Sequence, residues 1–254
     1  NEDVVKKIGF AISHKCIDLG IDEICVGRDG RISGKSLLDA LIEGIIESGI
    51  NVLNIDLATS PLLYYAAKKN KNKSGVMITG SHNPKNHNGI KLVINDNPVS
   101  GKEILALINQ GKPSSNSIGN VKEINIKDSY IKEVVDSSKI NKNIKVVIDC
   151  GNGAAGFIAP ELYKKLGCEV IELFSEVDGN FPNHHPDPGK IDNLKDLINE
   201  VRKQKADLGL AFDGDGDRVG LVTDKGEVVF PDKIMMMLCK DILRIRKGSV
   251  IFDV

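Results

Sequence analysis

The feature that most constrains the fold is a unit that occurs once in each half of the chain. It consists of an apolar strand, a glycine-containing loop, a helix closed by glycine, and a second strand; one copy spans residues 25–57 and the other 146–173. Strand-like and helix-like stretches also alternate elsewhere, as in layered α/β folds. The pattern therefore predicts a duplicated architecture of two α/β domains.

The expected domain boundary lies near Ser138, which gives domains of residues 1–138 and 139–254. A polar connection over 112–120 and a helix over 127–137 precede the boundary. Residues 250–254 read as a strand at the start of a further, missing domain. Helices are expected over 4–19, 37–48, 102–109, 127–137, 160–166, 194–203 and 232–244, and strands over 23–26, 51–57, 75–79, 90–94, 144–148, 169–173, 207–212 and 219–223.

The overall charge bears on the partners of this chain, and its cysteine pattern bears on the compartment in which it works. With 34 basic and 35 acidic residues the net charge is −1, so nothing global favours nucleic acid or an anionic membrane as a partner. Uninterrupted apolar runs fall short of a membrane span. The five cysteines are scattered and form no Cys-x-x-Cys pair. This pattern favours a reducing compartment, and we expect a cytoplasmic protein.

The strongest motif is acidic: Asp213, Asp215 and Asp217 alternate with glycines directly after an apolar strand. Glycine lets the backbone bend until the three carboxylates converge, and hard oxygen ligands suit Mg²⁺ or Ca²⁺. An EF-hand would need glycine and glutamate at the positions that Arg218 and Asp224 occupy, so that interpretation fails. A solvated acidic turn is the alternative.

Two further loops each have a functional and a structural interpretation. Ser81 lies in a turn, Thr-Gly-Ser-His-Asn-Pro, which can expose its hydroxyl, although serine and asparagine are common in turns and Gly-x-Ser-x-Gly is not matched. The segment 151–156 fits Gly-x-Gly-x-x-Gly, and Glu172 follows about 20 residues on, as in dinucleotide-binding folds. Its glycines can equally serve a tight turn.

Arginine and histidine residues provide weaker candidates. Arg28 and Arg31 share one glycine loop after a strand, and arginine is the usual bidentate ligand of phosphate. We name both as candidate phosphate-binding residues, with a solvated turn as the alternative. His184 and His185 are adjacent in an extended segment and point in opposite directions, which favours an ordered loop over a metal site.

Together these motifs resemble the α-D-phosphohexomutase family. Thr-Gly-Ser-His-Asn-Pro at 79–84, with Asn-Gly-Ile-Lys at 88–91, resembles the family's phosphoserine loop, and Asp-Gly-Asp-Gly-Asp-Arg at 213–218 resembles its metal loop. Segments 26–31, 149–154 and 181–188 resemble family segments in matching order. The resemblance covers nearly the whole chain and is closest to the bacterial phosphomannomutase/phosphoglucomutase branch.

The resemblance implies three-layer α/β/α domains with mixed, mostly parallel sheets, and a phosphosugar substrate. Hexose 1-phosphate and 6-phosphate would interconvert through a hexose 1,6-bisphosphate. Because the family's third and fourth domains are absent, we expect the fragment alone to be inactive. The implied site comprises the phosphorylated Ser81, Mg²⁺ on Ser81 and the three aspartates, His82 and Lys91 in catalysis, and Arg218 and Lys233 near substrate.

Two other functions stay open at this point. One is a nucleotide-dependent α/β enzyme that uses the loop 151–156. The other is a non-catalytic metal-binding module in which Ser81 is never phosphorylated.

Overall fold

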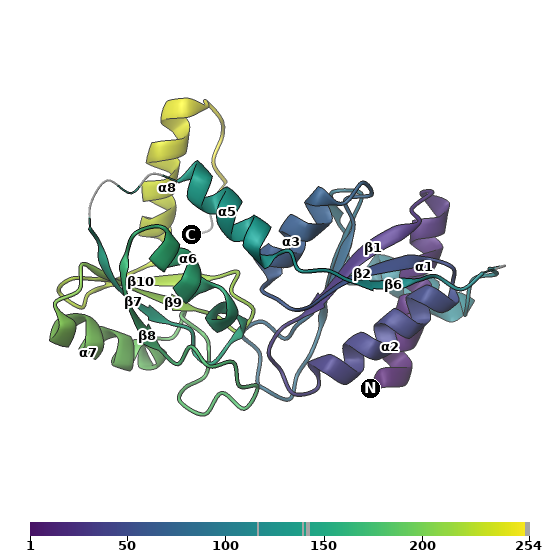
Figure 1. The fold of residues 1–254 in the computed structure, drawn as a ribbon, viewed down its shortest axis with the longest axis horizontal. Coiled ribbons are helices and arrows are strands. Elements are labelled where there is room, and N and C mark those ends of the chain that lie inside the picture. Colours follow the sequence, from purple (N-terminus) through teal and green to yellow (C-terminus); the bar gives the residue numbers. More distant parts are fainter. Residues whose placement is uncertain (116, 139, 141–142, 252–254) are drawn as a thin grey trace.

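The computed structural model describes residues 1–115, 117–138, 140 and 143–251, and these form two α/β lobes side by side (Figure 1). Each lobe has one sheet with helices on both faces. The fold class expected from the sequence is thereby confirmed. Among the described residues, no helix combines the length and the apolar character that crossing a membrane requires.

The first sheet has the strand order β5-β4-β3-β1-β2-β6. Strands β1, β2, β3 and β6 are parallel, whereas β4 runs antiparallel to both β3 and β5. The elements are α1 (Glu2–Asp18), β1 (Glu23–Arg28), α2 (Gly34–Glu47), β2 (Asn51–Leu57), α3 (Ser60–Lys69), β3 (Gly75–Ile78), β4 (Ile90–Ile94), β5 (Asn97–Pro98), α4 (Gly101–Leu107), η1 (Ile108–Gln110), β6 (Val121–Glu123) and α5 (Lys127–Ser137).

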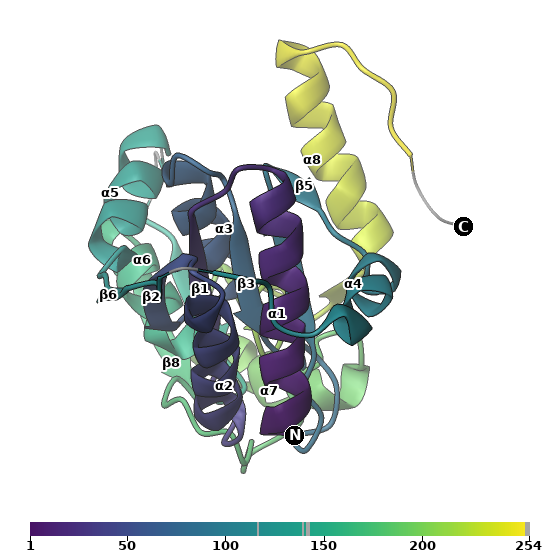
Figure 2. The ribbon, with the colours of Figure 1, turned by 90° about the vertical axis from the view of Figure 1, so that its right-hand side faces the viewer.

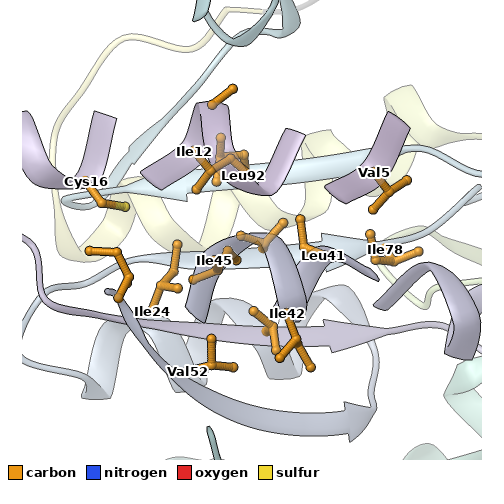
Figure 3. Packing of buried hydrophobic residues seen from close by; sticks show 14 of the residues in the cluster. Val5, Ile12, Cys16, Ile24, Leu41, Ile42, Ile45, Val52, Ile78 and Leu92 are labelled. Carbon is orange, nitrogen blue, oxygen red and sulfur yellow. The ribbon is translucent and has the colours of Figure 1, made fainter. Parts of the chain in front are cut away.

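Strand alternation explains the layers of this domain, because successive side chains point to opposite faces of the sheet. On β1, Ile24 and Val26 face α1, α2 and α4, and Figure 3 shows Ile12 and Ile45 packed over that face. Cys25 points the other way and packs beneath α3. Figure 2 shows α1 and α2 side by side, with α3 beyond the sheet.

The second sheet has the order β11-β10-β9-β7-β8. Its pairings are evenly split: β7 is parallel to β8 and β9, while β9–β10 and β10–β11 are antiparallel. The expectation of mostly parallel strands therefore holds only in the first sheet. The elements are β7 (Lys145–Asp149), η2 (Ala154–Phe157), α6 (Ala159–Lys165), β8 (Glu169–Leu173), η3 (Ile191–Leu194), α7 (Lys195–Gln204), β9 (Leu208–Phe212), β10 (Val219–Thr223), β11 (Val228–Val229) and α8 (Pro231–Ile245).

Helices cover both faces of the second sheet as well. Leu197 and Val201 of α7 pack on one face with Val147, and Ala159 of α6 packs on the other face with Ile148. Helix α8 projects away from this lobe (Figures 1 and 2), and none of its described residues is buried.

Two expectations about the chain's organisation need comment. Helix α3 (Ser60–Lys69) has no counterpart among the expected elements, which is a correction of consequence because its first residue reaches the candidate site. The boundary expected near Ser138 lies between the two sheets and remains a prediction. For the strand expected over 250–254, Val250 and Ile251 are not in a strand, and 252–254 lie outside the described residues.

Candidate active site

The turn that presents Ser81 follows β3 (Gly75–Ile78), and we call residues 79–88 the serine turn. The Thr79 hydroxyl accepts a hydrogen bond from the Ser81 amide at 2.8 Å and donates one to Asp29 at 2.8 Å. Ser81 itself has φ of 48°, the left-handed conformation that non-glycine residues adopt only at a cost. Such strain is retained where surrounding contacts enforce it, most often at functional sites.

The acidic motif forms a turn between β9 and β10, which we call the metal loop (residues 213–218). One oxygen each of Asp213, Asp215 and Asp217 lies within 4.8 Å of the other two. Asp213 Oδ1 accepts the backbone N–H groups of Asp217 and Arg218 at 3.1 Å, so the loop is folded around that carboxylate. The convergence expected from the alternating glycines is therefore present.

The serine turn and the metal loop meet although they belong to different domains. Ser81 Oγ donates to Asp213 Oδ2 at 2.8 Å. The backbones approach so closely that a Cβ at Gly214 would lie 2.5 Å from the Ser81 carbonyl oxygen, and only glycine fits there without a shift. The geometry thus unites a hydroxyl and three carboxylates, which the sequence separates by more than a hundred residues.

Lys91 of β4 provides the positive charge of the site. Its Nζ donates at 2.6 Å to Asp215 Oδ2 and at 2.6 Å to Asp217 Oδ2. Partial burial lowers the pKa of Lys91, but the hydrogen bonds that it donates to these two carboxylates, together with their negative charges, outweigh burial and raise the pKa overall. The side chain is therefore an ammonium at neutral pH.

The environment of Asp213 makes ionisation of its carboxyl less favourable than usual. Burial is the main cause and the negative charge of Asp215 the next, and together they raise the pKa of Asp213 to about 6. Two carboxylates this close resist simultaneous ionisation. A cation among the three side chains would remove the repulsion.

Ser60, the first residue of the unexpected helix α3, also belongs to the site. Its hydroxyl donates to Asp215 Oδ2 at 2.5 Å, and its backbone N–H donates to the Asp215 carbonyl at 2.9 Å. Both side chains are fully buried. The signal that could have found this helix is Thr59-Ser60-Pro61, an N-cap residue with proline in the first turn.

The residues present fit a hard divalent cation such as Mg²⁺. The donor set is three carboxylates and one hydroxyl, all of them oxygen ligands. Asp215 Oδ1 is buried and has no hydrogen-bond partner among the described residues. A buried carboxylate oxygen without a partner is unfavourable, and coordination of a cation would satisfy it.

His82 and Arg218 join the serine turn and the metal loop a second time. Arg218 Nη1 donates to His82 Nδ1 at 2.5 Å, and burial together with the Arg218 charge lowers the pKa of His82. His185, which the sequence places in an ordered loop, donates from Nε2 to the His82 carbonyl at 2.6 Å. Sequence reasoning did not assign His185 to the site.

Three candidate phosphate ligands lie outside the cluster. Arg28 donates hydrogen bonds to the Asp56 carboxylate at 2.8 Å and to the Asp29 carbonyl at 3.1 Å. Arg31 is 1% exposed, and protein acceptors take up its guanidinium, so the phosphate-binding interpretation is corrected to a structural one. Lys233 is exposed on α8, and no hydrogen bond within the described chain joins it to the cluster.

The glycine loop 151–156 is occupied by protein contacts. Three of its backbone N–H groups donate to acceptors within the protein, at 2.8–2.9 Å. Gly151 donates to Asp149 Oδ1, Asn152 to the Phe174 carbonyl, and Ala154 to the Gly214 carbonyl. A Cβ at Gly153 would lie 2.9 Å from the Gly214 carbonyl oxygen. These glycines therefore allow close packing against the metal loop. The nucleotide-binding interpretation would instead need free N–H groups in this loop to bind a pyrophosphate.

Comparison with known sequences identifies the family. The family model described as phosphoglucomutase/phosphomannomutase alpha/beta/alpha domain I matches residues 1–114, and the model for domain II matches residues 128–226. A phosphomannomutase/phosphoglucomutase of Pseudomonas putida is 51% identical over 97% of this chain and 54% of its own length. A phosphoglucomutase of Neisseria gonorrhoeae is 46% identical over 100% of this chain and 56% of its own. The chain thus spans about half the length of these relatives.

Solved structures agree with this assignment. A phosphoglucomutase/phosphomannomutase family protein of Burkholderia thailandensis is 37% identical, with a TM-score of 0.93 over 98% of this chain and 57% of its own. A structure from Thermus thermophilus, titled as a phosphomannomutase, shares the fold with a TM-score of 0.82 at 23% identity. The chain therefore belongs to the phosphoglucomutase/phosphomannomutase family and contains that family's α/β/α domains I and II.

Proposed function

We propose that this chain is the phosphoryl-transfer half of a phosphohexomutase, an isomerase that interconverts hexose 1-phosphates and hexose 6-phosphates. The observation that supports the proposal most directly is the 2.8 Å contact between Ser81 Oγ and Asp213 Oδ2. It places a half-buried nucleophilic oxygen beside a carboxylate cluster suited to a divalent cation. Phosphoryl transfer depends mainly on such positioning and on neutralisation of charge.

In the proposed cycle Ser81 carries the phosphoryl group. A sugar hydroxyl oxygen bonds to phosphorus as the bond from phosphorus to Ser81 Oγ breaks, and the proton that the hydroxyl loses is balanced by the one that Ser81 gains. The hexose 1,6-bisphosphate so formed reorients and returns its other phosphate to Ser81. Lys91, held as an ammonium by Asp215 and Asp217, neutralises charge on the transferring oxygens.

Asp213, Asp215, Asp217 and a phosphate oxygen on Ser81 would hold one Mg²⁺. When bound, the ion supplies neutralisation of phosphate charge. Arg218 and His82 border the same cluster and orient the phosphoryl group. Without a cation, a phosphoserine of charge roughly −1.5 to −2 would be repelled by the three carboxylates.

The other parts of the proposal concern the whole protein. Domains outside this chain would recognise the sugar and the second phosphate, and we expect residues 1–254 alone to be inactive. A cytoplasmic location is supported by five free thiols, three of them buried. Neither nucleic acid nor membrane is proposed as a partner.

The test measures the phosphate on Ser81 in the full-length protein. Wild type and Ser81→Ala are incubated with Mg²⁺ and glucose 1,6-bisphosphate, and intact mass is recorded before and after phosphatase treatment. The proposal requires one added phosphate on wild type and none on Ser81→Ala. If wild type carries no serine-dependent phosphate while still binding Mg²⁺, the protein is a non-catalytic metal-binding module and the proposal fails.

A further inference from the structure

We propose that Arg31 is a positioning residue that fixes the serine turn for phosphoryl transfer. This inference rests on the proposed role of Ser81 as the phosphoryl carrier. Arg31 lies before α2, about fifty residues ahead of the turn, and its side chain is fully buried. It does not touch the acidic cluster, so its action on the reaction is indirect.

The guanidinium of Arg31 uses all five of its N–H groups within the protein. Nε donates to Asp29 Oδ2 at 3.1 Å, and the two terminal nitrogens donate to backbone carbonyls of the serine turn. Nη2 donates to the carbonyls of Ser81 and Asn83, both at 2.8 Å. Nη1 donates to the carbonyl of Pro84 at 2.6 Å and to that of His87 at 3.0 Å.

Asp29 extends this hold to the first residues of the turn. The Oδ2 atom that pairs with Arg31 also accepts from the Thr79 hydroxyl at 2.8 Å and from the Gly80 amide at 3.2 Å. Arg31 lies so close to the backbone that a Cβ at Gly80 would be 2.4 Å from its Cζ. One buried ion pair therefore contacts both ends of the serine turn.

The second domain closes over the same guanidinium. The ring of Phe181 lies with its centroid 5.4 Å from Arg31 Cζ, within the range of cation–π contact. Phe181 is buried and belongs to the loop that also carries His185, the donor to the His82 carbonyl. The position of the serine turn is thereby tied to the domain that provides the metal loop.

The turn needs this support because it lacks regular secondary structure, and its hydrogen bonds to the metal loop and to His185 involve Ser81 and His82 at its start. Residues 79–89 contain neither helix nor strand, and most side chains from His82 to Asn88 are exposed. The left-handed backbone at Ser81 persists only where surrounding contacts enforce it. A displacement of the reacting oxygen by about 1 Å can slow a reaction about 100-fold.

The substitution Arg31→Lys tests the proposal, because lysine keeps the charge but lacks the planar fork that reaches four carbonyls. In the full-length protein we expect the single-turnover rate of phosphate transfer from glucose 1,6-bisphosphate to Ser81 to fall about 100-fold. KM should stay close to wild type. Amide exchange should accelerate at residues 80–88 and remain unchanged in β1 and β3.

Arg202→Lys is the matched control, since Arg202 also donates to a backbone carbonyl, that of Lys225, away from the serine turn. It should leave both the rate and the exchange unchanged. If Arg31→Lys lowers only the melting temperature, while its folded fraction transfers phosphate at the wild-type rate, Arg31 is merely structural and the proposal is overturned. Wild-type exchange at 80–88 in the variant would overturn it equally.

A measurement on wild type decides the matter if Arg31 variants do not fold. Arginine-selective ¹⁵N labelling should give one guanidinium with four separate, slowly exchanging Nη–H resonances, because each is bonded to a fixed carbonyl. Fast rotation of every guanidinium would overturn the proposal. Should wild type carry no phosphate on Ser81, the proposed function fails, whereas the exchange and resonance measurements still report on the hold of Arg31 over the turn.

Discussion

Replacing Ser60 with alanine tests whether the first domain holds a metal ligand of the second. Ser60 Oγ donates to Asp215 Oδ2 at 2.5 Å, and both side chains are 0% exposed. Alanine removes the donor and leaves that oxygen with Lys91 as its remaining partner. The other oxygen, Oδ1, already has none among the described residues.

The magnitude follows from the burial of this pair. A hydrogen bond to a charged group contributes about 1.5–3 kcal/mol, and a buried acceptor left unsatisfied is at the upper end. We expect Ser60→Ala to lower the free energy of unfolding by about 2–3 kcal/mol at neutral pH. Loss of the group that orients a metal ligand typically weakens metal binding by 10–100-fold, and we expect about 10-fold for Mn²⁺.

Denaturant titration and calorimetric Mn²⁺ titration measure the two effects, with Ser36→Ala as the control. Ser36 Oγ also donates to a carboxylate, that of Glu2 at 2.8 Å, but this pair lies at the surface. The control should change neither quantity measurably. The reasoning is refuted if Ser60→Ala and Ser36→Ala have equal effects on stability, or if Mn²⁺ affinity is unchanged in Ser60→Ala.

Three further predictions concern charge and packing around the site. Lys91→Met should slow phosphate transfer to the serine about 100-fold in single-turnover assays, and an unchanged rate would contradict its charge-neutralising role. Burial lowers the pKa of His184, but its hydrogen bond to Asp149 at 2.9 Å, the charge of Asp149 and the contact with the His185 carbonyl together outweigh burial and raise the pKa. Stability from the pair is therefore full below about pH 6.5 and is lost as pH rises through the raised pKa. His184→Gln should therefore be more destabilising at acidic than at alkaline pH in denaturant titrations, and a constant difference would speak against the pair. Gly153→Ala should weaken Mn²⁺ binding because its Cβ would lie 2.9 Å from a metal-loop carbonyl, whereas Gly101→Ala, with open space, should not.

The sequence predicted what depends on local pattern. Short apolar stretches identified the central strands, and the alternation of aspartate with glycine identified the metal loop. The motif around Ser81 identified the turn that presents its hydroxyl. In each case the information lies within about ten residues, where backbone periodicity and turn chemistry decide the structure.

The sequence did not reveal what depends on domain packing. Ser60 contacts Asp215 across 155 positions, and no local pattern marks a serine at a helix start as a ligand's partner. Arg31 also shows that local sequence does not reveal what a side chain contacts in the folded protein. A glycine loop with arginine after a strand looks the same whether its guanidinium binds phosphate in a cleft or backbone carbonyls in a core, and only burial distinguishes the two.

The distribution of contacts around the acidic cluster explains why both domains are needed for the site. Asp213 is bonded to Ser81, and Asp215 to Ser60 and Lys91, all three from the first domain. Three carboxylates this close would repel one another without those partners or a cation. The second domain therefore provides the three carboxylates, whereas the first provides Ser81, the other hydrogen-bond donors and the positive charge that make the convergence of the carboxylates tolerable. The candidate cation site therefore lies at the interface between the domains, and we expect any change that separates the serine turn from the metal loop to weaken metal binding and phosphate transfer together.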